Sequence, residues 1–118
     1  MEYYKELLHI RFAEQVMGWT GIEPSREEGA LKFYGFVHTG KGPQRFEVPD
    51  YSNDLNAMWA AEQYLDRSGL TGAYVKALSE VVRAADLSDD KDLFKIICAS
   101  PAQRCEAALR AYQAVNIN

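Results

Sequence analysis

The sequence predicts an α+β domain in which a small β-sheet is covered by helices, in an α/β/α sandwich-like arrangement. Three observations favour this class: apolar residues recur at helical spacing near both ends of the chain, an aromatic-rich run alternates at the period of a strand, and Gly-rich turn chemistry follows that run. The 118 residues are enough for one core and too few for two, so residues 1–118 are expected to form a single domain. The expected order is helix, strand, strand, helix, helix or strand, strand, helix.

The first predicted element is a helix over residues 2–17. Its apolar stripe repeats every four residues, through Tyr4, Leu8, Phe12 and Val16. Gly18 follows directly and can end the helix, because glycine readily adopts the left-handed conformation that closes many helices. Residues 21–29 combine glycine, proline and charged side chains, a composition that predicts a loop.

A β-hairpin is predicted next. Residues 31–38 are rich in aromatic side chains and carry large apolar groups on both faces, so neither face is expected to be fully exposed to solvent. Residues 39–44 have turn chemistry, and residues 45–48 form a short second strand that Pro49 ends. The simplest connection is a hairpin with a loop of about six residues.

The middle helix is predicted to begin after residues 50–54, with Ser52 or Asn53 as its cap. Its apolar stripe comprises Leu55, Met58, Trp59 and Leu65, which places the tryptophan in the core. Glu62 interrupts the stripe, and we expect it at the edge of the buried face with its carboxylate in water. Gly69 is the expected end of this helix.

Residues 71–85 fit a helical face and are rich in helix-forming residues, so a helix is the preferred prediction and a strand the alternative. Residues 86–92 form an acidic link, and the apolar run at residues 93–98 is typical of a buried strand. The last helix has the clearest start, a capping box in which Ser100 caps the helix and Gln103 lies three positions later. Its apolar stripe comprises Cys105, Ala108, Leu109, Tyr112 and Val115.

Composition and charge argue against several classes of function. The chain carries 13 basic and 17 acidic side chains, a formal net charge of −4, so it is not expected to bind nucleic acid directly or to bind an anionic membrane. No apolar run approaches the roughly 18 residues that a membrane-spanning helix needs. Residues 1–6 lack the basic-then-apolar order of a signal peptide.

No catalytic or metal-binding pattern is evident in the sequence. Cys98 and Cys105 lie seven residues apart, which matches no zinc pattern, and both are expected to be buried thiols in a reducing cytosol. His9 and His38 each occupy a position typical of a half-buried packing residue, so neither is assigned a catalytic role. The sequence therefore predicts no catalytic residue, no metal site and no cofactor.

Three residues are candidates for binding. Trp19 follows the first helix, in a position compatible with either the core or an interface. Lys41 and Arg45 lie in and beside the hairpin loop and could hold an anion. The loop itself is more typical of a flexible hairpin tip than of a phosphate-binding loop, because Lys41 is not followed by Ser or Thr at the start of a helix.

Three segments together resemble a known family: VMGW at residues 16–19, YSNDLNAMW at residues 51–59 and SPAQRCEAALRA at residues 100–111. They are similar to the phage ABA sandwich domain family of small phage and prophage proteins, over about residues 7–115. The resemblance implies a sheet layered between helices. It implies no established activity, cofactor or catalytic residue.

The preferred functional hypothesis is a small non-enzymatic accessory protein of a phage or prophage. Such a protein would act in the cytoplasm of the bacterial host by binding a host or phage protein, for example as an inhibitor of a defence system. A small-molecule binding or nucleotide-signal sponge protein is the alternative, and a small enzyme is the least favoured class. Surplus apolar surface on the first helix and strand also predicts a homo-oligomer.

Overall fold

The computed structural model describes residues 3–116. The elements run in the order η1 (Tyr3–Glu6, a 3₁₀ helix), α1 (Leu8–Gln15), β1 (Thr20–Glu27), β2 (Ala30–Thr39), β3 (Gly42–Glu47), α2 (Leu55–Arg67), α3 (Thr71–Val82), α4 (Asp90–Ile97) and α5 (Pro101–Asn116). The fold is α+β, as predicted. Its order differs from the prediction: a short helical region precedes three antiparallel strands, and four helices follow.

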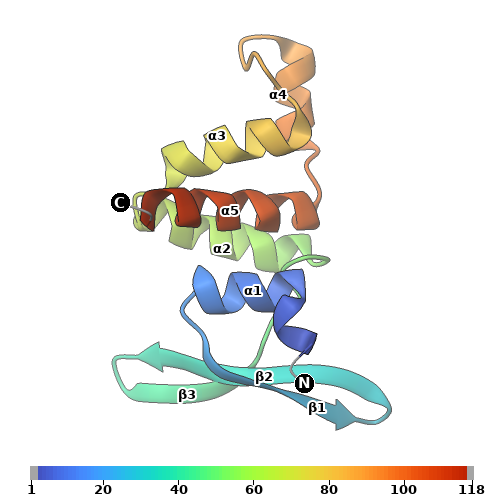
Figure 1. The fold of residues 1–118 in the computed structure, drawn as a ribbon, viewed down its shortest axis with the longest axis vertical. Helices are drawn as coiled ribbons and strands as arrows, with labels where there is room; N and C mark the ends of the chain where they lie inside the picture. The colour runs from blue at the N-terminus through green and yellow to red at the C-terminus, as the bar shows by residue number, and fades with distance from the viewer. Residues whose placement is uncertain (1–2, 117–118) are drawn as a thin grey trace.

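The sheet lies at one end of the molecule and is not sandwiched between helices (Figure 1). α1 covers one face of it, α2, α5 and α3 are stacked beyond α1, and α4 lies at the far end. The other face carries exposed side chains, including Phe36, His38 and Arg45. The predicted sandwich-like arrangement was wrong because an antiparallel sheet can bury its apolar residues on one face and leave the other to solvent.

The predicted first helix is divided in two. Leu7 has an extended backbone (φ −64°, ψ 136°) between η1 and α1, so the regular helix is shorter than residues 2–17. Glu2, at the start of that prediction, lies outside the described residues. Phe12 on α1 is fully buried, and Gly18 adopts the left-handed conformation just beyond the helix (φ 77°), as predicted.

Most of residues 21–29 belong to strand β1 rather than to a loop, because they pair antiparallel with β2. The register of this pairing shifts between Thr20 and Glu23, where Gly21 has a positive φ of 60°. An edge strand tolerates such a bulge, and it also tolerates a proline such as Pro24. The composition that predicted a loop is therefore that of an irregular edge strand.

The β2–β3 hairpin is confirmed, but its turn is tighter than predicted. Thr39 pairs with Gly42, so only Gly40 and Lys41 lie between the strands. β3 consequently begins earlier than the predicted strand at residues 45–48.

Helix α2 is capped by Asp54 and not by Ser52 or Asn53. The Asp54 carboxylate accepts hydrogen bonds from the backbone N–H groups two and three residues further on, at 3.0 and 3.3 Å. Ser52 and Asn53 instead donate their side-chain hydrogen bonds to Asp50. Asp54 caps the helix because the side chains of Ser52 and Asn53 are hydrogen-bonded to Asp50 in the preceding turn.

The prediction that Trp59 lies in the core was wrong. The buried face of α2 runs through Met58, Ala61 and Leu65, whereas Trp59 is 51% exposed. Successive residues of a helix are about 100° apart, so a face centred on these three residues leaves Trp59 pointing outward. Gly69 has a positive φ of 77° beyond the end of α2, as predicted.

The helical preference for residues 71–85 is confirmed by α3, but the buried strand predicted at residues 93–98 is wrong. Those residues belong mostly to α4, and part of the predicted acidic link begins this helix. The Asp89 carboxylate caps it, accepting a hydrogen bond from the Lys91 backbone N–H at 2.8 Å. None of the eight residues of α4 is buried.

The capping box of the last helix is confirmed. The Gln103 backbone N–H donates to Ser100 Oγ at 3.1 Å, and the Ser100 backbone N–H donates to Gln103 Oε1 at 2.9 Å. α5 packs against α1, α2 and α3 and is the central helix of the molecule. Its Leu109 is buried as predicted, whereas Val115 near its end is exposed.

Candidate protein interface

The three predicted binding residues lie in different environments. Trp19 is buried, which favours the core alternative for this side chain, and it also lines an open hollow of about 390 Å³ beside the start of β1. Lys41 is exposed in the hairpin turn. Arg45 is exposed on β3, with its guanidinium carbon 4.3 Å from the centre of the Tyr34 ring. Arg45 therefore already has an aromatic partner within the sheet.

The two histidines differ in burial. His9 is half-buried, as predicted, with its ring 5.7 Å from that of Phe33 and its Nδ1 atom 3.9 Å from Asp50 Oδ1. Burial lowers the pKa of His9 below its ordinary value, and the Asp50 charge opposes that shift. His38 is exposed rather than half-buried, and its Nε2 lies 2.9 Å from Thr20 Oγ1.

The two cysteines also differ. Cys105 is buried as predicted, and burial raises the pKa of its thiol to about 12. Cys98 is exposed, contrary to the prediction, because it follows the exposed helix α4 and does not end a buried strand.

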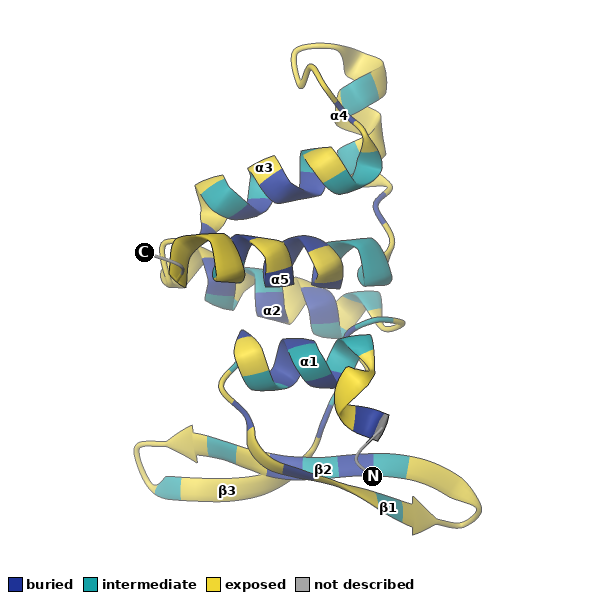
Figure 2. Ribbon diagram, in the orientation of Figure 1, coloured by how far each residue is buried: buried dark blue, intermediate teal, exposed yellow. Residues whose placement is uncertain are grey.

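Among the described residues, α4 carries three exposed large apolar side chains. Phe94 is 63% exposed, Ile97 62% and Leu93 43%. Their spacing places all three on one side of the helix, and we refer to them as the α4 cluster. Figure 2 shows α4 largely exposed at the end of the molecule opposite the sheet. Contiguous apolar surface of this kind marks interaction sites in proteins.

Polar contacts hold the other side of α4 against the bundle. Lys95 Nζ donates to the backbone oxygen of Arg83 at 3.1 Å and lies 3.4 Å from Asp92 Oδ1. The second oxygen of Asp92 accepts the backbone N–H of Asp86 at 2.9 Å, which lowers the pKa of this carboxyl. Ile96 packs against the core. The α4 cluster consequently faces solvent because the polar residues and Ile96 occupy the inner side.

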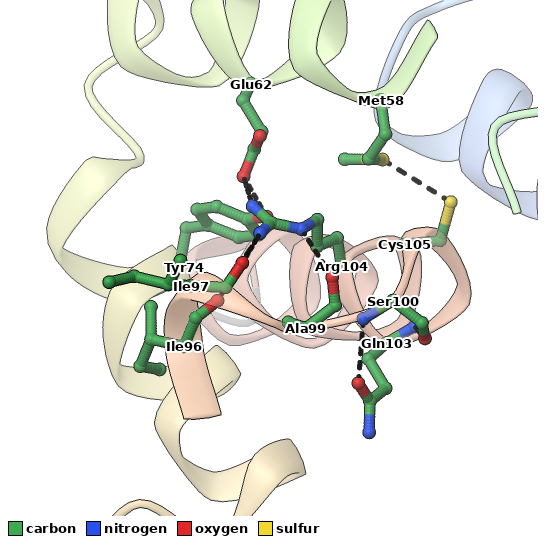
Figure 3. Close-up of polar contacts among 10 residues, drawn as sticks. All are labelled: Met58, Glu62, Tyr74, Ile96, Ile97, Ala99, Ser100, Gln103, Arg104 and Cys105. Atoms are coloured by element: carbon green, nitrogen blue, oxygen red, sulfur yellow. Dashed lines mark hydrogen bonds and ion pairs between the residues drawn. The ribbon is translucent and has the colours of Figure 1, made fainter. Parts of the chain in front are cut away.

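Arg104 of α5 fastens the C-terminal end of α4 (Figure 3). Its Nε donates to the Ala99 oxygen at 3.0 Å, and its Nη2 lies 3.3 Å from the Ile96 oxygen and 3.1 Å from the Ile97 oxygen. Carbonyls at the end of a helix lack partners within the helix, and a guanidinium supplies donors for them. Arg104 therefore restrains the turn that carries Ile97.

The same guanidinium is anchored to α2. Arg104 Nη1 lies 2.9 Å from Glu62 Oε2, which also accepts a hydrogen bond from the Tyr74 hydroxyl at 2.6 Å (Figure 3). The Arg104 and Glu62 side chains are only 11% and 22% exposed, so the prediction that the Glu62 carboxylate lies in water was wrong. Burial, and then the hydrogen bond and charge of Glu62, raise the pKa of Tyr74. We call these three side chains the Arg104 clamp.

Sequence reasoning missed both the α4 cluster and the Arg104 clamp. The clamp had one sequence signal, the charged Glu62 within the apolar stripe of α2, which is compatible with a buried partner of opposite charge. Nothing in the sequence identified Arg104 as that partner, because the pair is separated by 42 positions.

A comparison with known protein families, with curated proteins and with solved structures finds no match for this chain. Within residues 3–116, no helix combines the length and apolar character needed to cross a bilayer. The same described range contains no group of three or more His, Cys, Asp or Glu side chains that could hold a metal ion.

Proposed function

We propose that this chain is a non-enzymatic binding protein that inserts helix α4 into an apolar groove of another protein. The observation that supports this most directly is the α4 cluster, three large apolar side chains exposed on one side of a helix that the Arg104 clamp and Lys95 restrain. A helix with apolar anchors at such spacing is a common ligand for a hydrophobic groove. Restraint before binding reduces the entropy lost when the complex forms.

The size of the α4 cluster favours a groove over a flat contact. Full burial of one large apolar side chain contributes about 1.5–3 kcal/mol, so covering the exposed part of the cluster contributes roughly 3–5 kcal/mol. Association itself costs at least about 4 kcal/mol. A groove that surrounds the helix also buries the apolar surface of its own walls, and this adds to the binding free energy. A flat contact buries less of the partner's apolar surface.

Charge around the α4 cluster defines the rim of the proposed groove. Residues 86–98 contain four aspartates and two lysines. Asp92 and Lys95 pair with each other on the inner side of α4, with side chains 19% and 49% exposed, which leaves three aspartates and one lysine. The solvent-facing side of this segment is therefore acidic. A partner with Lys or Arg side chains around an apolar groove would complement it.

The biological setting of the proposal comes from the sequence resemblance alone. The resemblance implies a phage or prophage accessory protein that would act in the bacterial cytoplasm on a host or phage protein. An inhibitor of a defence system fits this setting, since nucleic-acid-binding host proteins commonly carry the basic surfaces that an acidic helix would meet.

The test is affinity purification of the tagged chain from a bacterial lysate, followed by binding measurements with the purified partner. The variant Phe94→Asp/Ile97→Asp should weaken that binding by about a hundredfold or more, because two side chains that the proposed complex buries in the groove become charged. Trp59→Asp is the matched control, since it changes an exposed aromatic residue on a different helix.

The two variants should unfold at nearly the parent temperature, because exposed substitutions change stability by about 0.5 kcal/mol or less. Equal affinity of the partner for the parent and the α4 double variant would exclude the proposed site. A co-purifying nucleotide whose binding requires Lys41 and Arg45, with no protein partner, would favour the small-molecule alternative instead.

A further inference from the structure

Strand β3 has a free edge. The strand order is β1-β2-β3, so within the described part of the chain β3 pairs only with β2. Phe46, the last residue but one of β3, is 49% exposed. A free edge presents backbone donors and acceptors that can pair with another strand.

The ladder with β2 shows which groups of β3 face outward. The Val48 backbone N–H donates to the Phe33 oxygen at 2.7 Å, which makes this pair a hydrogen-bonded one. Hydrogen-bonded and non-hydrogen-bonded pairs alternate along an antiparallel ladder. Phe46 therefore also bonds toward β2, whereas Arg45 and Glu47 direct their backbone N–H and C=O groups to the free edge.

We propose that the free edge of β3 pairs antiparallel with the same edge of a second copy of this chain, about a two-fold axis that passes beside Phe46. In this register the outward-facing backbone groups of Arg45 bond to those of the partner's Glu47, and the reverse pair forms at the other side of the axis. The result is a six-stranded antiparallel sheet that spans both copies.

Charge and proline select this register over its neighbours. A shift of one copy by two residues in either direction places Arg45 opposite the partner's Arg45, or Glu47 opposite the partner's Glu47. The shift that pairs the two Arg45 residues also sets Glu47 opposite the partner's Pro43. The shift that pairs the two Glu47 residues sets Arg45 opposite the partner's Pro49. Both shifts lose backbone hydrogen bonds, because proline has no N–H to donate. Opposite charges and complete backbone bonding coincide only in the proposed register.

The side chains on both faces also suit the proposed pairing. Arg45 and Glu47 lie on the solvent face, where Lys32 is 3.9 Å from Glu47 Oε1 and 4.0 Å from Glu27 Oε2. The partner's Arg45 would extend this row of alternating charge. Phe46 lies on the opposite face, so the two copies bring their exposed phenylalanine rings together at a non-hydrogen-bonded site, where cross-strand side chains approach most closely.

The other edge of the sheet is less suited to pairing. β1 has a register shift between Thr20 and Glu23 next to Pro24, and together these interrupt a regular edge, whereas on β3 the prolines at positions 43 and 49 flank the pairing segment Arg45–Glu47 and lie outside it. One usable edge for each copy gives a closed dimer and not a filament. α4 lies at the far end of the molecule from β3 (Figure 1), so the dimer is independent of the proposed groove binding and leaves both α4 clusters exposed.

Sedimentation velocity over a range of protein concentrations tests this dimer. The parent should shift with concentration from the 13.3 kDa monomer mass toward twice that value. Glu47→Arg and Arg45→Glu each place like charges opposite one another at two positions, and each should weaken the dimer by about tenfold or more. An equimolar mixture of these two variants should dimerise again, because every cross-edge pair then joins opposite charges.

Glu23→Arg, which makes the same charge change on the β1 edge, is the control and should leave the dimer unaffected. The proposal is overturned if the parent stays monomeric at high concentration, or if the mixed variants fail to pair while each retains its fold by circular dichroism. It is equally overturned if the single variants dimerise as well as the parent does. Loss of the dimer in the α4 double variant would assign self-association to α4 instead.

Discussion

The two hydrogen bonds between Ser100 and Gln103 satisfy backbone and side-chain groups at the start of the central helix. The first N–H groups of a helix have no partner within it, and the Ser100 hydroxyl supplies one. Ser100→Ala should therefore lower the free energy of unfolding by about 1 kcal/mol. Urea denaturation should show a lower midpoint with an unchanged slope.

Ser68→Ala is the matched control for this substitution, because Ser68 is an exposed serine at the C-terminal end of a different helix, α2. It should change the free energy of unfolding by about 0.5 kcal/mol or less. Identical midpoints for Ser100→Ala and the parent would mean that the capping box does not contribute to stability.

His9 should make the stability of the protein depend on pH. Burial lowers its pKa below the ordinary value of 6.5, with Asp50 opposing the shift, so below pH 6.5 the unfolded chain binds more protons than the folded one. The stability contributed by neutral His9 is complete above pH 6.5 and is lost as the pH falls through the folded pKa. Thermal unfolding at about pH 7.5 and pH 5.5 should show a larger decrease for the parent than for His9→Gln. Equal decreases would exclude His9 as the source.

At the scale of elements, α4 depends on α5 for its position. Arg104 donates to three carbonyl oxygens in and just after the last turn of α4 and pairs with Glu62. Arg104→Leu therefore removes those donors and leaves the partly buried Glu62 carboxylate without its cation, with only the Tyr74 hydroxyl still donating to it. We expect a loss of about 2–3 kcal/mol. Amide hydrogen exchange should increase most in the last turn of α4.

Arg110→Leu provides the control on the same helix. Arg110 pairs with Glu106 at 2.9 Å, but both side chains are about half exposed, and exposed ion pairs contribute about 1 kcal/mol or less. The Arg104 substitution should therefore be the more destabilising of the two. Similar effects of both changes would argue that the Arg104 clamp adds nothing beyond a surface ion pair.

At the scale of the whole molecule, the stacked arrangement gives an elongated shape. The radius of gyration of the Cα atoms is 15.3 Å, with extents of 46 × 33 × 26 Å, whereas a compact domain of this length would have about 13.5 Å. Small-angle scattering of the Glu47→Arg variant, chosen to suppress dimerisation, should give a radius at or above 15.3 Å. A value near 13.5 Å would indicate that α4 or the sheet folds back against the bundle.

Local signals in the sequence were sufficient for several elements. The capping box placed the start of α5, Gly18 and Gly69 marked the ends of two helices, and the aromatic run at residues 31–38 predicted β2. These features depend on side chains within about four residues of the backbone groups that they affect. They are therefore readable without knowledge of the rest of the fold.

The tertiary structure alone decided the identity of β1, the exposure of Trp59 and the nature of α4. A strand such as β1 exists because a neighbour supplies hydrogen bonds, and composition does not report that neighbour. An apolar run such as residues 93–98 is compatible with a buried strand or an exposed helix, depending on which surfaces surround it. The candidate interface was missed for this reason. The sequence by itself determined that Leu93, Phe94 and Ile97 are apolar. Only the packing of α4 against α3 and α5 decided that these side chains face solvent, because the other side of the helix is the one that contacts the bundle.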